Sequence, residues 1–236
     1  SFRHVMRLMR RKAAFPPLGL LTVAAMLPRS WRLKLVDLDV TALEDDDIDT
    51  ADWIMLSGMI IHTDSCREIA ARCSARGKPV IAGGPLFTTG HEHFPEIPHF
   101  VLGEAEEVMP CLVADMIRGA VQECYAAPRK PDLALAPVPR WDLVSFRDYV
   151  TAPVQFSRGC PFDCEFCDIP IMYGRTPRVK TPEQVLRELD VLLEAGWREA
   201  IFIVDDNFIG HRAKAKRLLQ AVIDWRRRRA THIPLI

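Results

Sequence analysis

The sequence lacks the features typical of membrane-spanning, secreted or nucleic-acid-binding proteins. Its 236 residues carry 31 basic and 31 acidic side chains, so the formal net charge is zero and no overall field favours nucleic acid as a partner. No apolar run approaches the roughly 20 residues of a membrane-spanning helix. The opening residues 1–4 also lack the apolar core of a secretion signal. We therefore expect a cytoplasmic protein without a membrane span.

The cysteines do not form a pattern typical of disulfides. There are seven, an odd number, and three of them lie within eight residues, which suits a metal or redox role in a reducing compartment better. A structural zinc site normally has a fourth Cys or His ligand, but the sequence has no second Cys-x-x-Cys pair. The remaining cysteines are scattered over the earlier part of the chain: Cys66, Cys73, Cys111 and Cys124.

Three thiols in one short loop, Cys160, Cys164 and Cys167, are close enough in sequence to reach a single iron-sulfur cluster. A four-iron cluster held by only three thiolates keeps one iron open. That iron can hold the amino and carboxylate groups of a small molecule and pass it an electron. We therefore predict that these three cysteines are the metal ligands of the protein.

From residue 16 to about 115 the chain alternates between helix-like and strand-like segments, which predicts a parallel sheet covered by helices. Helices are expected at 16–27, 64–75 and 106–117, and strands at 33–36, 53–56, 79–82 and 99–102. Because such sheets normally begin with a strand, we expect one upstream of Ser1. Prolines gather between 119 and 149 where the alternation fails, which indicates a linker.

After the linker the strand–helix alternation resumes. Strands are expected at 154–157 and 200–204 and helices at 182–195 and 213–228, the first of them begun by Thr181, Pro182 and Gln184 as a capping box. The apolar segment 231–236 indicates the start of a further strand. This is how a (β/α) barrel begins, and we expect the chain to be part of a longer protein. The basic run 226–229 is typical of a solvated helix end.

Two carboxylates, Asp205 and Asp206, directly follow the expected strand 200–204. In a barrel this carboxyl edge is where active-site groups converge. The alternative is that they cap the amino terminus of the next helix, a position that Asp and Asn favour.

The segment 157–167, Ser-Arg-Gly-Cys-Pro through Phe-Cys, resembles the radical S-adenosylmethionine enzymes, whose signature is three cysteines spaced three and two residues apart with an aromatic before the third. The resemblance implies that a reduced 4Fe-4S cluster on Cys160, Cys164 and Cys167 cleaves S-adenosylmethionine to a 5′-deoxyadenosyl radical. It also implies that Phe166 contacts the cofactor and that Asp205 and Asp206 hold the ammonium of S-adenosylmethionine.

The first part of the chain resembles the cobalamin-binding domain that precedes the barrel in many of these enzymes. Glycine-bearing turns follow three expected strands, at the edge where open α/β sheets bind ligands, although tight turns alone would also account for them. The resemblance implies four cofactor contacts: Ser57, Gly83, Gly84 and Glu104. The Asp-x-His-x-x-Gly motif that supplies a lower cobalt ligand in other cobalamin proteins is absent, which argues against a histidine-ligated cobalt.

The expected fold is therefore α/β, with a Rossmann-like cobalamin-binding domain at 1–118, a linker at 119–150 and the beginning of a partial TIM-type barrel at 151–236. The resemblance, strongest to the subgroup containing hopanoid methylases, implies a C-methyltransferase acting on an unactivated carbon. Its substrate would be a small molecule or lipid, and its electrons would come from an external donor. Radical cyclisation or rearrangement without methyl transfer, and a nonenzymatic iron-sulfur redox module, remain alternatives. No catalytic side chain is assigned.

Overall fold

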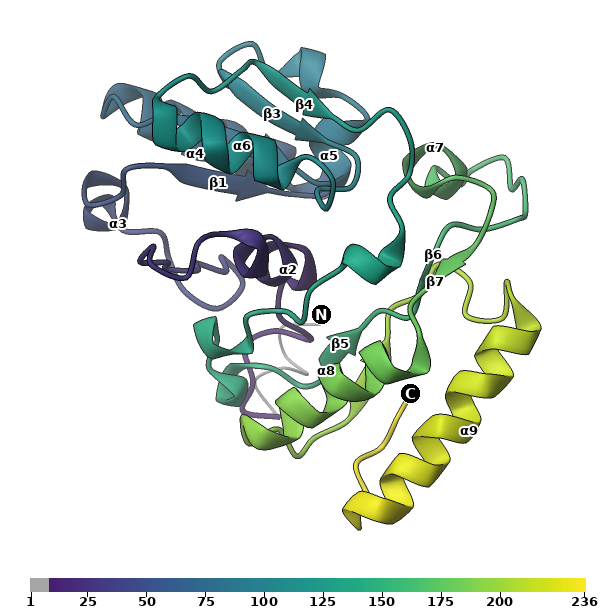
Figure 1. Cartoon of the computed structure of the whole chain (residues 1–236). Coiled ribbons are helices and arrows are strands. Elements are labelled where there is room, and N and C mark those ends of the chain that lie inside the picture. The colour runs from purple at the N-terminus through teal and green to yellow at the C-terminus, as the bar shows by residue number, and fades with distance from the viewer. Residues whose placement is uncertain (1–8) are drawn as a thin grey trace. The chain divides into compact units, whose positions relative to one another are not determined.

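The computed structural model describes residues 9–236, and the chain divides into two compact units (Figure 1). The sheet unit consists of residues 26–31 and 42–131. The cysteine unit consists of the described residues up to 25, residues 32–41 and residues 132–236. Within residues 9–236, no helix combines the length and the apolar character needed to cross a membrane.

The sheet unit is built on four parallel strands, β1 (Ile54–Ser57), β2 (Val80–Gly83), β3 (His99–Leu102) and β4 (Cys124–Ala126), paired in that order (Figure 1). The register places Ser57 beside Gly83 and Gly83 beside Val101. Because all the pairings are parallel, the carboxyl ends of the strands meet at one edge. The turns that follow β1, β2 and β3 are therefore neighbours.

Short helices connect these strands, as parallel pairing requires. They are η1 (Ile60–His62), α4 (Thr63–Ala75), α5 (Pro85–Thr88), η2 (His91–His93) and α6 (Met109–Arg118), while α3 (Asp45–Asp49) precedes β1. Helix α4 buries Cys66, Ile69 and Cys73, which recur at helical spacing, in one core with Val80 of β2 and Phe87 of α5. Cys66 and Cys73 are therefore core residues, and their burial raises the pKa of both thiols.

The cysteine unit has the strand–helix order expected for the start of a barrel. Strand β5 (Ala152–Val154) pairs in parallel with β8 (Ile201–Ile203), and the short β6 (Ser157–Arg158) pairs with β7 (Arg178–Val179) in antiparallel fashion. Its helices are α2 (Leu18–Met26, all but its last residue), α7 (Ile169–Tyr173), α8 (Pro182–Glu194) and α9 (Arg212–Arg229), with 3₁₀ turns η3 (Leu133–Leu135), η4 (Trp141–Leu143) and η5 (Phe146–Asp148).

The predicted start of α8 is confirmed. The Gln184 N–H donates to the Thr181 hydroxyl at 3.2 Å, and the Thr181 N–H donates to the Gln184 side chain at 2.9 Å. Pro182 occupies the first helical turn, where its missing N–H costs no hydrogen bond. The expected further strand is also present in outline, because Ile201 forms a parallel bridge with Leu235.

Three expectations about secondary structure were wrong. Residues 33–36 form no strand: no backbone among the described residues 9–236 pairs with them, and Leu35 packs against the core of the cysteine unit. The segment expected as an irregular linker contains β4, which completes the sheet. The strand expected at 154–157 is broken into β5 and β6, which have different partners.

Candidate functional site

The cysteine loop starts from a backbone turn that only glycine fits. Gly159, directly after β6, has a φ of +91°, and a Cβ there would lie 2.9 Å from the Gly174 carbonyl oxygen. The carbonyl oxygens of Tyr173 and Thr176 would lie 3.1 Å from the same Cβ. The Cys160 N–H donates to the Gly174 carbonyl at 3.2 Å. The first cysteine is therefore fixed between β6 and the end of α7.

The three thiols of the loop are free. Cys160 and Cys167 are half-buried and Cys164 is exposed; the Cys167 N–H donates to the Cys164 carbonyl at 3.0 Å. Among residues 9–236 no three His, Cys, Asp or Glu side chains converge on one point that could hold a single metal ion. A four-iron cluster takes each thiolate at a different iron, so its ligands do not need to converge in this way. Phe166, beside the third cysteine, is 93% exposed.

Asp205, after β8, binds the strand that leads into the cysteine loop. Its two carboxylate oxygens accept hydrogen bonds from the Phe156 N–H and from the Ser157 hydroxyl, both at 2.7 Å. Burial raises the pKa of this carboxyl, and the hydrogen bonds from Ser157 and Phe156 oppose the shift. The side chain is thus turned toward β6.

The next two residues continue this contact. Asp206 accepts a hydrogen bond from the Gly159 N–H at 3.1 Å, and the Asn207 side-chain amide donates to Cys160 Sγ at 3.5 Å. Burial also raises the pKa of the Asp206 carboxyl. The alternative that the carboxylates cap the next helix is wrong, because α9 begins only after His211, which is its N-cap.

In the sheet unit, the turns after β1, β2 and β3 interlock. Gly84 has a φ of +87°, and a Cβ there would lie 2.4 Å from the Ser57 hydroxyl oxygen. A Cβ on Gly83 would lie 3.1 Å from the Val101 carbonyl oxygen. The Gly103 N–H donates to the Thr88 hydroxyl at 2.9 Å, which ties the third turn to α5. The structure therefore brings the predicted serine and the two glycines together.

The fourth predicted contact of this unit, Glu104, directly follows Gly103 and is buried. Thr88, which joins the second and third turns, was missed by the sequence analysis. Its position inside a short helix gives no signal that its hydroxyl reaches across to another turn.

The turn after β1 presents apolar side chains to solvent. Ile60 and Ile61 are 80% and 78% exposed, and Met59 beside them is about half exposed. Isolated exposed apolar residues are ordinary, whereas contiguous ones indicate a binding surface. Ser57 in this turn is predicted from the sequence as a cofactor contact, but the isoleucine pair is not. Two adjacent isoleucines in a turn are nevertheless a signal that can be read from the sequence.

His62 follows this apolar pair. Its Nδ1 accepts a hydrogen bond from the Met59 N–H at 3.2 Å, so in the neutral ring the proton is on Nε2. The hydrogen bond holds the imidazole ring against the turn that follows β1.

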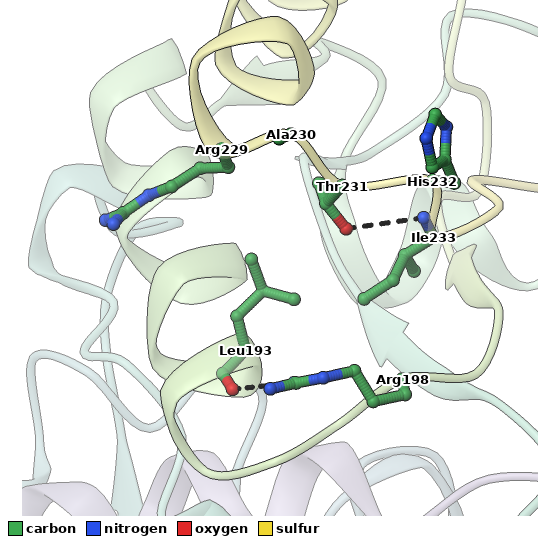
Figure 2. A pocket seen from close by; sticks show the side chains of 7 residues that line it. All are labelled: Leu193, Arg198, Arg229, Ala230, Thr231, His232 and Ile233. Carbon is green, nitrogen blue, oxygen red and sulfur yellow. Dashed lines mark hydrogen bonds between the residues drawn. The ribbon is translucent and has the colours of Figure 1, made fainter.

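A hollow of about 470 Å³ lies elsewhere in the cysteine unit (Figure 2). It is lined by Leu193, Arg198, Arg229, Ala230, Thr231, His232 and Ile233. Arg198 donates to the Leu193 carbonyl at 2.8 Å on one side of it (Figure 2). These residues precede β8 and the bridging Leu235, which places the hollow at the amino edge of the strands. The cysteine loop leaves the opposite, carboxyl edge, where barrel enzymes hold their active sites.

Comparison with known proteins agrees with both parts of the sequence analysis. The model of the B12 binding domain matches residues 7–113, and that of the Radical SAM superfamily matches residues 154–232. The chain belongs to the cobalamin-binding radical S-adenosylmethionine enzymes. Membership implies a 4Fe-4S cluster, S-adenosylmethionine and cobalamin as cofactors.

Relatives in this family include methyltransferases. The chain is 43% identical to an uncharacterised methyltransferase of Synechocystis over 95% of its own length and 42% of the relative. It is 38% identical to the hopanoid C-2 methylase of Rhodopseudomonas palustris over 100% of its length and 46% of that protein. The chain thus spans less than half of these curated relatives.

The fold also agrees with a solved structure of the family. The enzyme OxsB, determined with aqua-cobalamin and S-adenosylmethionine bound, matches 98% of this chain and 37% of its own, with a TM-score of 0.73 and 18% identity. The predicted fold class, an α/β cobalamin-binding domain followed by a radical S-adenosylmethionine domain, is confirmed.

The residues present fit the implied cofactors. A loop that offers three free thiols and is anchored at one end suits a cluster with one open iron. In the sheet unit, the missing Cβ atoms of Gly83 and Gly84 allow the backbone of neighbouring turns to approach closely. The apolar turn at 59–61 beside them suits a large cofactor with apolar surface.

Proposed function

We propose that the full-length protein is a cobalamin-dependent radical S-adenosylmethionine C-methyltransferase that acts on an unactivated carbon. The observation that carries the proposal is the anchored loop with three free thiols, in one chain with a B12-binding sheet. When bound, the cluster would supply the electron that cleaves S-adenosylmethionine, and cobalamin would supply the methyl group.

In this proposal Cys160, Cys164 and Cys167 bind the cluster. Phe166 is the aromatic side chain next to the third ligand, and its exposure leaves it available to a bound nucleoside. Asp206 is the better candidate of the two carboxylates for contact with S-adenosylmethionine, because both oxygens of Asp205 already accept hydrogen bonds.

For cobalamin we propose the interlocked turns of the sheet unit: Ser57, Gly83, Gly84 and Glu104. We add Ile60 and Ile61, whose exposed side chains would offer an apolar surface to the corrin ring. The proposed domain bounds are 1–118 for cobalamin, 119–150 for the linker and 151–236 for the barrel part; the family models at 7–113 and 154–232 support the two domain assignments.

The proposed substrate is a small molecule or lipid, for which the similarity to a hopanoid methylase is the support. A radical formed at the cluster reacts within contact distance, so the substrate carbon and the methyl donor must both lie beside it. The protein would need an external electron donor and would work in the reducing cytoplasm. We propose no nucleic-acid partner, because the formal net charge is zero.

The test is an anaerobic reaction of the full-length protein, loaded with cluster and cobalamin, with methyl-labelled S-adenosylmethionine and a hopanoid lipid as first substrate. Label in the product, together with 5′-deoxyadenosine, is the expected result. Formation of 5′-deoxyadenosine with an unlabelled, rearranged product would instead favour radical cyclisation or rearrangement. A loaded, reduced protein that leaves S-adenosylmethionine intact would contradict enzyme function and favour a redox module.

A further inference from the structure

Three consecutive side chains after β8 form hydrogen bonds with four residues of the segment that leads into the cysteine loop. Asp205 binds the backbone N–H at 156 and the hydroxyl at 157, Asp206 binds the N–H at 159, and Asn207 reaches the thiol at 160. The contacts follow one another in register along both segments. Such a series fixes the first cysteine more firmly than any one hydrogen bond could.

This arrangement differs from the role implied by the family resemblance. A carboxylate that holds the ammonium of a ligand needs an oxygen directed at the ligand, but both Asp205 oxygens accept hydrogen bonds from within the chain. Asp205 is half-buried. Without its carboxylate, the Phe156 N–H would lose its hydrogen-bond acceptor. The contacts therefore indicate support of the loop.

We infer that Asp205 and Asn207 are positioning residues for the cluster, and that Asn207 also sets its reduction potential. The inference rests on the proposed function, because it requires Cys160 to be a cluster ligand. Asp205 fixes the backbone before the first ligand, and Asn207 donates to the ligand sulfur itself.

The physical reason is the charge of the two redox states. Reduction by one electron from an external donor adds negative charge to the cluster and its thiolates. An N–H that donates to a thiolate sulfur stabilises the more negative state, which raises the reduction potential. At 3.5 Å the Asn207 nitrogen is within hydrogen-bonding distance of Cys160 Sγ, so loss of this donor should make the cluster harder to reduce.

The test replaces Asn207 by Leu, which is similar in size but has no donor, and by Asp, which puts an oxygen in place of the amide nitrogen. The full-length protein is loaded with cluster, and the midpoint potential is measured by EPR-monitored titration without S-adenosylmethionine. The N207L protein should show about tenfold less reduced cluster at a fixed potential, equivalent to about 59 mV for a one-electron couple.

The expected order of potentials places the parent highest, N207L below it and N207D lowest. Equal potentials in the parent and N207L would overturn the inference. If N207L does not retain the cluster, the comparison of N207D with the parent decides, and equality there would overturn it too. A parent protein that binds no cluster at all would refute the proposed function instead, so the two failures can be told apart.

Discussion

A buried ion pair between the end of β7 and α8 provides a sharp test of the fold. Lys180, directly after β7, donates to Glu188 of α8, and their side chains are 6% and 2% exposed. Burial raises the pKa of the Glu188 carboxyl, while the charges of Lys180 and Arg158 oppose the shift. The charge of Lys180 also opposes the rise that burial causes in the pKa of the Asp205 carboxyl. One ammonium therefore serves two carboxylates.

Replacing Lys180 with Met removes the charge and keeps most of the packing volume. Glu188 is left as a buried carboxylate without its principal partner, and breaking a buried pair in this way costs about 3–5 kcal/mol. In the double variant K180M/E188M neither member of the ion pair is left as a buried charge without its partner. That variant should recover most of the loss, because replacing both partners of a buried pair by apolar residues is often neutral or stabilising.

The pH dependence has a definite sign. In K180M the folded-state pKa of Glu188 rises further above its unfolded value of about 4.3, so the folded protein binds more protons than the unfolded chain above that pH. Stability of the variant then falls as pH rises through this range. The difference between K180M and the parent should accordingly be smaller at pH 5 than at pH 8.

Urea unfolding followed by tryptophan fluorescence measures the effect where it occurs, because Trp141, Trp197 and Trp225 lie in the core of the cysteine unit. The exposed Lys216 provides the control: K216M should change the free energy of unfolding by no more than about 0.5 kcal/mol. A K180M protein as stable as K216M at pH 8, or a double variant no better than K180M, would refute the argument.

The remaining predictions concern the cofactor sites. Cys164→Ala should abolish cluster binding, measured as iron content and visible absorption; survival of both would contradict the ligand assignment. Gly84→Ala should weaken cobalamin binding far more than Gly77→Ala, because both glycines have positive φ but only at Gly84 would a Cβ strike a neighbouring turn. The double variant I60S/I61S should likewise weaken cobalamin binding in an absorbance titration, and unchanged affinity would exclude the apolar turn from the site.

The sequence predicted those elements whose signals are local. Helix α8 was found at its first residue because Thr181, Pro182 and Gln184 specify a helix start by themselves. Strands β1, β2 and β3 were found within a residue because each is a short apolar run between turns. The cysteine spacing identified the loop for the same reason, since three thiols in eight residues need no tertiary information.

The predictions were wrong where the structure of a segment depends on a second segment that pairs with it. Residues 33–36 form a short, mostly apolar run like that of a strand, but a strand requires a second backbone, and none within residues 9–236 pairs with them. Strand β4 was missed because Cys124–Ala126 is too short to show alternation and becomes a strand only beside β3. The orientation of Asp205 could not be read either, because its partners lie 48 and 49 residues earlier in the chain.

The difference between local signals and distant partners also explains how the site is assembled. The cysteine loop has few contacts of its own: residues 161–166 are exposed, and a loop of this kind orders poorly without outside support. The start of the loop is held by residues that lie later in the chain. Gly174, at the end of α7, accepts a hydrogen bond from the Cys160 N–H, and the segment from Asp205 to Asn207, after β8, binds the residues around it. Cys160 is thus held by contacts from outside the loop, whereas Cys164 lies on the exposed part of the loop.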